Sequence, residues 1–148
     1  LSVQEAGCLY ESGLWSIGGH TYDGHRLGMS GNYVQGPYYV TNIWKGPEDR
    51  LETEAEYKAR IWNDITLERA VLMRMGIDEP LDFAHPYGEF NEDVVKMLNE
   101  AGYKYLYLNV PGLNKPGQDP SLIYRITAGC NVHETMALLD WYFSQEIC

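Results

Sequence analysis

The sequence has few cysteines and no long apolar run, and each shortage excludes a class of protein. Its three cysteines, Cys8, Cys130 and Cys148, are odd in number and show no C-x-x-C spacing. This argues against a disulfide-rich scaffold and against a cysteine-ligated zinc site, although one bridge, for example between Cys8 and Cys130, stays open. No apolar run approaches the roughly 18 residues that a membrane-spanning helix needs. The composition therefore predicts a globular domain without a transmembrane segment.

Basic residues are scarce, with 11 Lys and Arg against 21 Asp and Glu and a formal net charge of −10. A negative field repels phosphate backbones and anionic lipids, so nucleic acid and membrane surfaces are poor partners. Neutral or cationic substrates stay open. The 12 Tyr and 4 Trp residues can stack on sugar rings, but they can equally fill a core.

Several common catalytic motifs are missing as well. The sequence contains no G-x-S-x-G nucleophile elbow, no P-loop and no G-x-G-x-x-G turn, and these are the usual signs of a serine hydrolase or a nucleotide-binding fold. Most acidic residues stand at expected helix starts, where the helix dipole accounts for them.

Expected helices and strands alternate along the chain. Capping residues and terminal glycines predict helices over residues 2–12, 53–75 and 91–101 and a last helix from about 131. Short strands are expected at 14–17, 81–85, 103–108 and 124–127, with another at 38–43 inside a long loop over 26–50. This order indicates an α/β fold with mainly parallel strands, in which functional groups gather at the C-terminal strand ends.

The two histidines of the segment GGHTYDGH, His20 and His25, are the sharpest feature. Imidazole binds zinc and similar ions well, and two histidines on one short loop can converge on one ion. Gly18, Gly19 and Gly24 would let the backbone turn tightly around that point. Spacing alone leaves the alternative open that this is a surface loop without function.

A second candidate group follows the strand expected at 81–85. The rigid turn Pro86-Tyr87-Gly88 would leave the Tyr87 N–H free to point into a cleft, as an oxyanion donor must. An ordinary strand-to-helix turn is the alternative. His85 can line the same cleft, whereas His133 is expected in the first turn of the last helix, in a solvated or capping role.

Four segments together resemble the polysaccharide deacetylases of carbohydrate esterase family four, especially the branch acting on poly-N-acetylglucosamine. ESGLWSIGGHTYDGHRL (residues 11–27) is similar to the family's histidine motif, and LDFAHPYGEFNEDVVKMLNEAGYKYLY (81–107) to its F-A-x-P-Y-G motif. RLETEAEYKARIWNDITLERAVL (50–72) resembles the helix between them. DPSLIYRITAGCN (119–131) is similar to the D-P-x-x-x-x-R-I segment of that branch.

The resemblance implies a distorted (β/α) barrel of the NodB-homology type. It also implies an extracellular or cell-envelope hydrolase that holds Zn²⁺, or another divalent metal such as Co²⁺ or Ni²⁺, with one Asp and two His. The residues carried over are His20 and His25 as metal ligands, Tyr87 as the backbone oxyanion donor with Pro86 beside it in the catalytic turn, and His85, Tyr22 and Asn114 as contacts to the acetylated polysaccharide. The metal would activate a water that a carboxylate base deprotonates.

The sequence departs from the family in three places. Nothing matches the T-F-D-D-G motif, which supplies the base and the metal Asp and would lie upstream of Leu1. We therefore expect residues 1–148 to be the C-terminal portion of the catalytic domain, inactive without the N-terminal part. Ala84 stands where distant members have an Arg that orients the base. The late catalytic His has no counterpart after Arg125, because His133 lies in an expected helix.

Two alternatives stay open beside an N-deacetylase. One is an esterase of the same fold that removes O-acetyl groups from xylan, which acetate release from acetylxylan and chitin-type oligomers would distinguish. The other is a non-catalytic carbohydrate-binding remnant, which the coding sequence upstream of Leu1 would distinguish.

Overall fold

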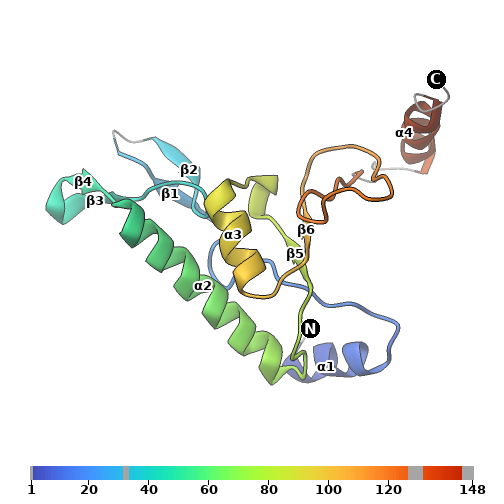
Figure 1. The fold of residues 1–148 in the computed structure, drawn as a ribbon, viewed down its shortest axis with the longest axis horizontal. Helices are drawn as coiled ribbons and strands as arrows, with labels where there is room; N and C mark the ends of the chain where they lie inside the picture. Colours follow the sequence, from blue (N-terminus) through green and yellow to red (C-terminus); the bar gives the residue numbers. More distant parts are fainter. Residues whose placement is uncertain (1, 32–33, 127–131, 145–148) are drawn as a thin grey trace.

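The computed structural model describes residues 2–31, 34–126 and 132–144 (Figure 1). Its elements are, in chain order, α1 (Val3–Glu11), β1 (Leu27–Met29), β2 (Gln35–Pro37), β3 (Trp44–Lys45), the 3-10 helix η1 (Gly46–Glu48), β4 (Arg50–Leu51), α2 (Glu54–Arg74), β5 (Asp82–Ala84), the 3-10 turn η2 (Pro86–Gly88), α3 (Glu92–Glu100), β6 (Tyr105–Tyr107) and α4 (Val132–Ser144). The strands β1 and β2 form one antiparallel pair and β3 and β4 another, whereas β5 and β6 are parallel.

Local capping determines where the long helix α2 begins. The Thr53 hydroxyl accepts a hydrogen bond from the Glu56 N–H, and the Glu56 carboxylate accepts one from the Thr53 N–H. This capping box satisfies two N–H groups that the first turn leaves unpaired. The same motif starts α1, and the Asn91 side chain caps α3. The three helices predicted from these signals are confirmed.

We expect the substitution Thr53→Ala to lower the free energy of unfolding by about 1 kcal/mol, the usual effect of losing a threonine N-cap. Urea unfolding followed by circular dichroism measures it. Thr66→Ala on the exposed middle of α2 is the matched control, because alanine favours helix interiors. Equal losses in both variants would contradict the role of the cap.

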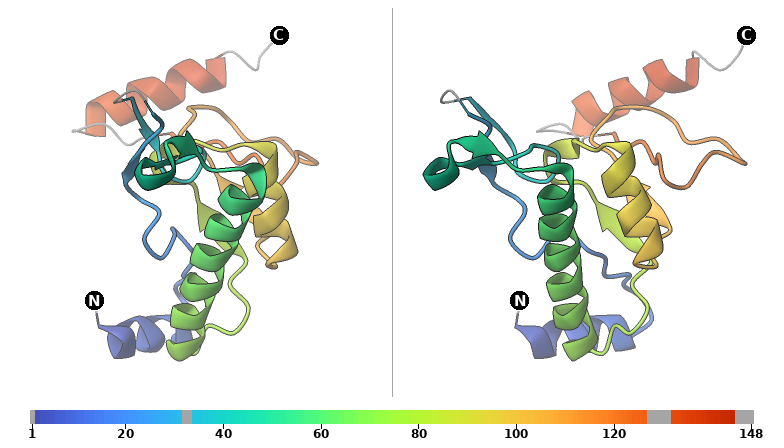
Figure 2. Two further views of the ribbon diagram at one scale, coloured as in Figure 1. Left: turned by 90° about the vertical axis from the view of Figure 1, so that its left-hand side faces the viewer. Right: turned by 60° about the vertical axis from the view of Figure 1, so that its left-hand side comes forward.

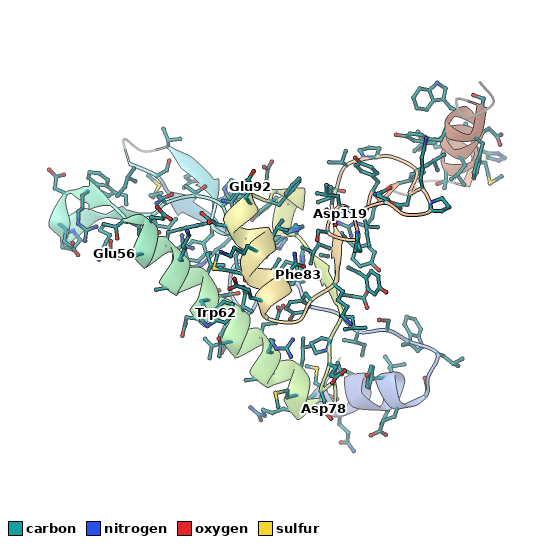
Figure 3. All side chains as sticks on the ribbon, viewed as in Figure 1. Glu56, Trp62, Asp78, Phe83, Glu92 and Asp119 are labelled. Atoms are coloured by element: carbon teal, nitrogen blue, oxygen red, sulfur yellow. The ribbon has the colours of Figure 1, made fainter. Side chains whose placement is uncertain are left out.

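The hydrophobic core lies between the helix pair α2 and α3 and one face of the parallel strands. Figure 3 shows Phe83 of β5 at the centre of the molecule, and Leu106 lies opposite it on β6. Both side chains are fully buried. The other buried members of the cluster are Tyr39, Tyr57, Ile61, Ile65, Val94, Met97, Leu98 and Tyr103. The long helix α2 therefore packs against the strands through this cluster.

Two predicted strands are wrong. Residues 14–17 do not form a strand: Leu14 is 85% exposed, and the pairing with β5 consists of a single bridge at Gly19. Residues 38–43 form a turn, and the strands of this region lie before and after it. A strand requires a partner to pair with, and partners distant in sequence are invisible to a local pattern.

The remaining expectations are met in part. β5 and β6 confirm two predicted strands, but the one expected at 124–127 is reduced to a bridge between Ile123 and Tyr107, and residue 127 lies outside the described part. The parallel pairing confirms the α/β class. Across the described residues the sheets are two-stranded, and they do not close a barrel.

The last helix, α4, is confirmed, although the residue expected to cap it, Asn131, lies outside the described residues. α4 lies at the opposite end of the molecule from α1 (Figure 2). Cys8 is an exposed free thiol, and the other two cysteines are not among the described residues. None of the described helices combines the length and apolarity needed to cross a bilayer.

Candidate metal site

The candidate residues lie at the C-terminal edge of the parallel strands. The Gly19 N–H donates to the Asp82 carbonyl at 2.8 Å, and the Ala84 N–H donates to the Gly19 carbonyl at 2.9 Å. On the other side, the His85 N–H donates to the Tyr107 carbonyl at 3.0 Å. This register places His20 directly after the Gly19 bridge and His85 directly after β5, where functional groups of parallel sheets gather.

The structure brings the rings of His20 and His25 together. Their centroids are 4.8 Å apart, and both residues are exposed. The Nδ1 atom of His20 lies 2.7 Å from the Ala84 carbonyl oxygen, so Nδ1–H donates and Nε2 keeps its free lone pair. Histidines that bind metals are oriented in this way, by a backbone carbonyl on the other ring nitrogen.

Two imidazoles whose ring centroids are 4.8 Å apart offer two nitrogen donors to a metal ion. Neutral imidazoles are suitable ligands for Zn²⁺, Co²⁺ or Ni²⁺. In the part of the chain that the structure describes, no group of three His, Cys, Asp or Glu side chains is placed to hold an ion. The described residues therefore offer two donors, fewer than the three protein ligands usual in catalytic zinc sites.

Tyr87 lies beside the pair, with its ring centroid 4.5 Å from that of His25. Its backbone has φ +58°, an unfavourable conformation for a tyrosine, and Gly88 follows at φ +75°. The N–H groups of Gly88 and Glu89 close the turn onto His85 and Pro86, and the Tyr87 N–H takes no part in these bonds. The turn therefore holds Tyr87 in a backbone conformation that an ordinary strand end does not require.

His85 is enclosed rather than exposed. It is only 1% accessible, and its ring packs against Phe83 and Phe90. Neither ring nitrogen has a hydrogen-bond partner among the described residues. Burial lowers the pKa of His85 to about 4, with a smaller contribution from the positive charge of Arg125. The buried imidazole is therefore neutral at pH 7.

The two other predicted substrate contacts lie in different surroundings. Tyr22 belongs to the histidine loop and is 56% exposed. Asn114 lies in the segment after β6, where its side chain donates to the Tyr124 carbonyl at 2.9 Å and accepts from the Tyr124 N–H at 2.9 Å. These bonds hold its own loop, whereas Tyr22 lies between the two histidines in sequence.

A cavity of about 450 Å³ opens beside His20, next to residues of β5 and β6. Asp82, Tyr107 and Arg125 are among its lining residues. The Tyr107 hydroxyl donates to the Asp82 carboxylate at 2.7 Å. Burial, followed by this hydrogen bond, raises the pKa of Tyr107 to about 12. The Asp82 carboxylate, which also accepts from Ser16, is thus occupied within the described structure.

Two acids of α2, Asp64 and Glu68, contact the histidine loop and were not singled out by the sequence. Asp64 accepts hydrogen bonds from the backbone of Tyr22 and Asp23, and Glu68 accepts one from the backbone of His20. Burial raises the pKa of Glu68, although these hydrogen bonds oppose it. The only sequence signal was their i, i+4 spacing on the helix face that also carries Ile61 and Ile65.

The sequence and the fold of this chain resemble those of known proteins. A family model described as polysaccharide deacetylase matches residues 3–106. The fold is similar to the BpsB deacetylase domain from Bordetella bronchiseptica, with a TM-score of 0.80 and 23% identity over 84% of this chain and 48% of that one.

Two further structures share the fold. The de-N-acetylase from Aggregatibacter actinomycetemcomitans has a TM-score of 0.80 and 22% identity, covering 93% of this chain and 52% of that chain. IcaB from Ammonifex degensii has a TM-score of 0.66 and 20% identity, with the same coverage of 93% and 52%. The chain thus spans about half the length of these structures. No curated protein matches it.

Proposed function

Because this chain belongs to the polysaccharide deacetylase family, we propose that it serves the removal of N-acetyl groups from an amino-sugar polysaccharide such as poly-N-acetylglucosamine. The observation that carries the proposal is the cluster of His20, His25 and Tyr87 at the C-terminal strand edge. The de-N-acetylase among the similar structures favours an amide over an ester substrate. An extracellular or cell-envelope location, where such polymers lie, is part of the same proposal.

In this proposal His20 and His25 are two ligands of a divalent metal, Zn²⁺ or an ion with similar preferences. When bound, the metal supplies a Lewis acid and lowers the pKa of a water molecule. The Ala84 carbonyl keeps Nε2 of His20 available by holding the proton on Nδ1. The supporting evidence is the short distance between two exposed imidazoles on a loop that the fold anchors.

The turn Pro86-Tyr87-Gly88 is proposed to stabilise the oxyanion. Pro86 has no N–H and a restricted φ, which makes the turn rigid, while the Tyr87 N–H is left outside the turn's own hydrogen bonds. A preorganised backbone donor of this kind stabilises the negative charge that develops when an acetamide carbonyl is attacked. The buried His85 supports this turn from inside, packed against Phe90.

The exposed rings of Tyr22 and Tyr87 are proposed to contact the sugar. Tyr22 lies between the two histidines in sequence, and the Tyr87 ring lies 4.5 Å from that of His25; both residues are roughly half exposed. Aromatic faces pack well against the apolar faces of pyranose rings. Asn114 is proposed as a contact farther along the polymer, because its loop follows β6 at the same strand edge.

Acetate release by the intact protein from N-acetylglucosamine oligomers tests the function, with acetylxylan as the comparison substrate. We expect release from the oligomers, loss of activity after chelation and recovery when Zn²⁺ is restored. Release from acetylxylan alone would identify an O-acetyl esterase instead. Binding of the oligomers without acetate release would indicate a carbohydrate-binding protein, and either result would contradict the proposal.

A further inference from the structure

We propose that Asp64 and Glu68 are positioning residues that hold the histidine loop, residues 20–25, in the shape that binds the metal. This inference rests on the proposed function for the identity of the ligand. The hydrogen bonds that the two acids make to the loop go to its backbone N–H groups. They act through the backbone of the loop, which places the rings.

Asp64 binds the middle of the loop, because both of its carboxylate oxygens accept backbone hydrogen bonds. Its Oδ1 accepts from the Tyr22 N–H at 3.0 Å and its Oδ2 from the Asp23 N–H at 2.8 Å. The side chain is only 7% exposed. Two successive N–H groups on one carboxylate determine both the position and the orientation of this peptide segment.

Glu68 receives the start of the loop, because its Oε1 accepts from the His20 N–H. Its Oε2 accepts from the buried Tyr103 hydroxyl at 2.8 Å, and the Tyr39 hydroxyl donates to Asp64 in the same way at 3.1 Å. Glu68 is 6% exposed. Each acid therefore accepts a hydrogen bond from a buried tyrosine hydroxyl as well as from the backbone of the loop.

The loop needs such support because its backbone is unfavourable by itself. Thr21, between the two anchored segments, has φ +78°, a region that β-branched residues avoid. Its hydroxyl accepts from the Gly24 N–H at 3.0 Å, which closes the turn. Without the carboxylates, the free loop has more favourable conformations in which the two rings would separate.

Two glycines, one just before the loop and one within it, allow its close approach to the acids and tyrosines. A Cβ atom on Gly19 would lie 2.6 Å from the Glu68 carboxylate and 2.7 Å from the Tyr103 hydroxyl. A Cβ atom on Gly24 would lie 2.4 Å from the Tyr39 ring. The glycines therefore do not provide a positive φ, as a tight turn would need, but space for the acids and tyrosines.

The hydrogen bonds of the two buried carboxylates point to the loop. Burying two acids is costly unless they gain strong hydrogen bonds, and the N–H groups of the loop supply such bonds. Asp64 and Glu68 are four residues apart on α2, so one rigid helix fixes both ends of the loop. Residues that orient metal ligands from behind commonly affect affinity strongly.

The test is the affinity for Zn²⁺ of Asp64→Asn and Glu68→Ala in the intact protein, measured by chelator competition. The amide of Asp64→Asn presents one acceptor and one donor, so it cannot receive two N–H groups, and Glu68→Ala removes the acceptor of the His20 N–H. We expect each substitution to weaken Zn²⁺ binding about 10- to 100-fold.

The matched controls are Tyr39→Phe and Tyr103→Phe, which remove a hydrogen bond from the same carboxylates but leave the loop contacts. Their affinities should stay within about twofold of the wild type, well below the effect of losing a residue that orients a ligand.

Amide hydrogen exchange in the metal-free protein gives a second readout. The N–H groups of His20, Tyr22 and Asp23 should exchange at least about tenfold faster in the acid variants than in the tyrosine controls, as expected for lost protection. The two acid variants test the inference independently, so the result from either variant that folds is sufficient. Unchanged affinity and unchanged exchange, or equal losses in the controls, would overturn the inference. If the wild type bound Zn²⁺ no better than His20→Ala/His25→Ala, the proposed function would fail, and the exchange comparison alone would decide whether the acids hold the loop.

Discussion

The double substitution His20→Ala/His25→Ala is expected to weaken Zn²⁺ binding by more than about 100-fold, since losing a residue that merely orients a ligand already costs up to that amount. Both rings are exposed and 4.8 Å apart, so their removal leaves the core intact. Acetate release from N-acetylglucosamine oligomers should fall with the metal. Isothermal titration of the metal-free protein with Zn²⁺ measures the first effect and a coupled acetate assay the second.

His133 provides the matched control, because it is an exposed histidine on α4. His133→Ala should leave both Zn²⁺ affinity and acetate release at the wild-type level. The single variants His20→Ala and His25→Ala should each lose most of the affinity, as neither imidazole alone makes a multidentate site. Tight Zn²⁺ binding by the double variant would show that the metal is held elsewhere.

The free energy of unfolding is expected to fall by about 3 kcal/mol between pH 6.5 and pH 4 because of His85 alone. Its pKa is lowered by burial to about 4, from 6.5 in an exposed histidine. Within this range the unfolded chain binds a proton that the folded protein cannot, so acid favours unfolding. Well above pH 6.5 the histidine is neutral in both states, and its contribution to the free energy of unfolding is fully retained.

Urea unfolding of the wild type and of His85→Leu, each in metal-free buffer from pH 4 to pH 8, isolates this effect. Other titrating groups are shared, so the difference between the two stability curves reports on His85. Leucine suits the apolar surroundings formed by Phe83 and Phe90. The difference should be constant from pH 7 to pH 8 and change in favour of the variant as the pH falls. Parallel curves down to pH 4 would refute the burial argument.

The part of the site that lies close together in sequence was predictable. His20 and His25 are five residues apart, so one loop brings them together whatever the rest of the fold does. The positions of His85 and Tyr87 at a strand end followed from the strand β5, which the sequence predicted. Their assigned roles in metal binding and catalysis stay predictions that the experiments above test.

The anchors of the site were not predictable in the same way. Asp64 lies 41 or 42 residues from the backbone groups it binds, and Glu68 lies 48 residues from His20. In the sequence they look like two more acids of a charged helix. Only the packing of α2 behind the strands shows that they are buried and face the loop. The loop glycines were likewise expected to serve tight turning, whereas they serve close approach.

The sequence by itself determined the helices, the two strands β5 and β6 and the histidine pair. Capping boxes, terminal glycines and the short spacing of His20 and His25 act within a few residues, and a local pattern records them. Only the tertiary structure decided that residues 14–17 form no strand, that His85 is buried, and that Asp64 and Glu68 hold the histidine loop. Each of these depends on a partner distant in the chain, and long-range pairing and burial leave no local pattern to be recognised.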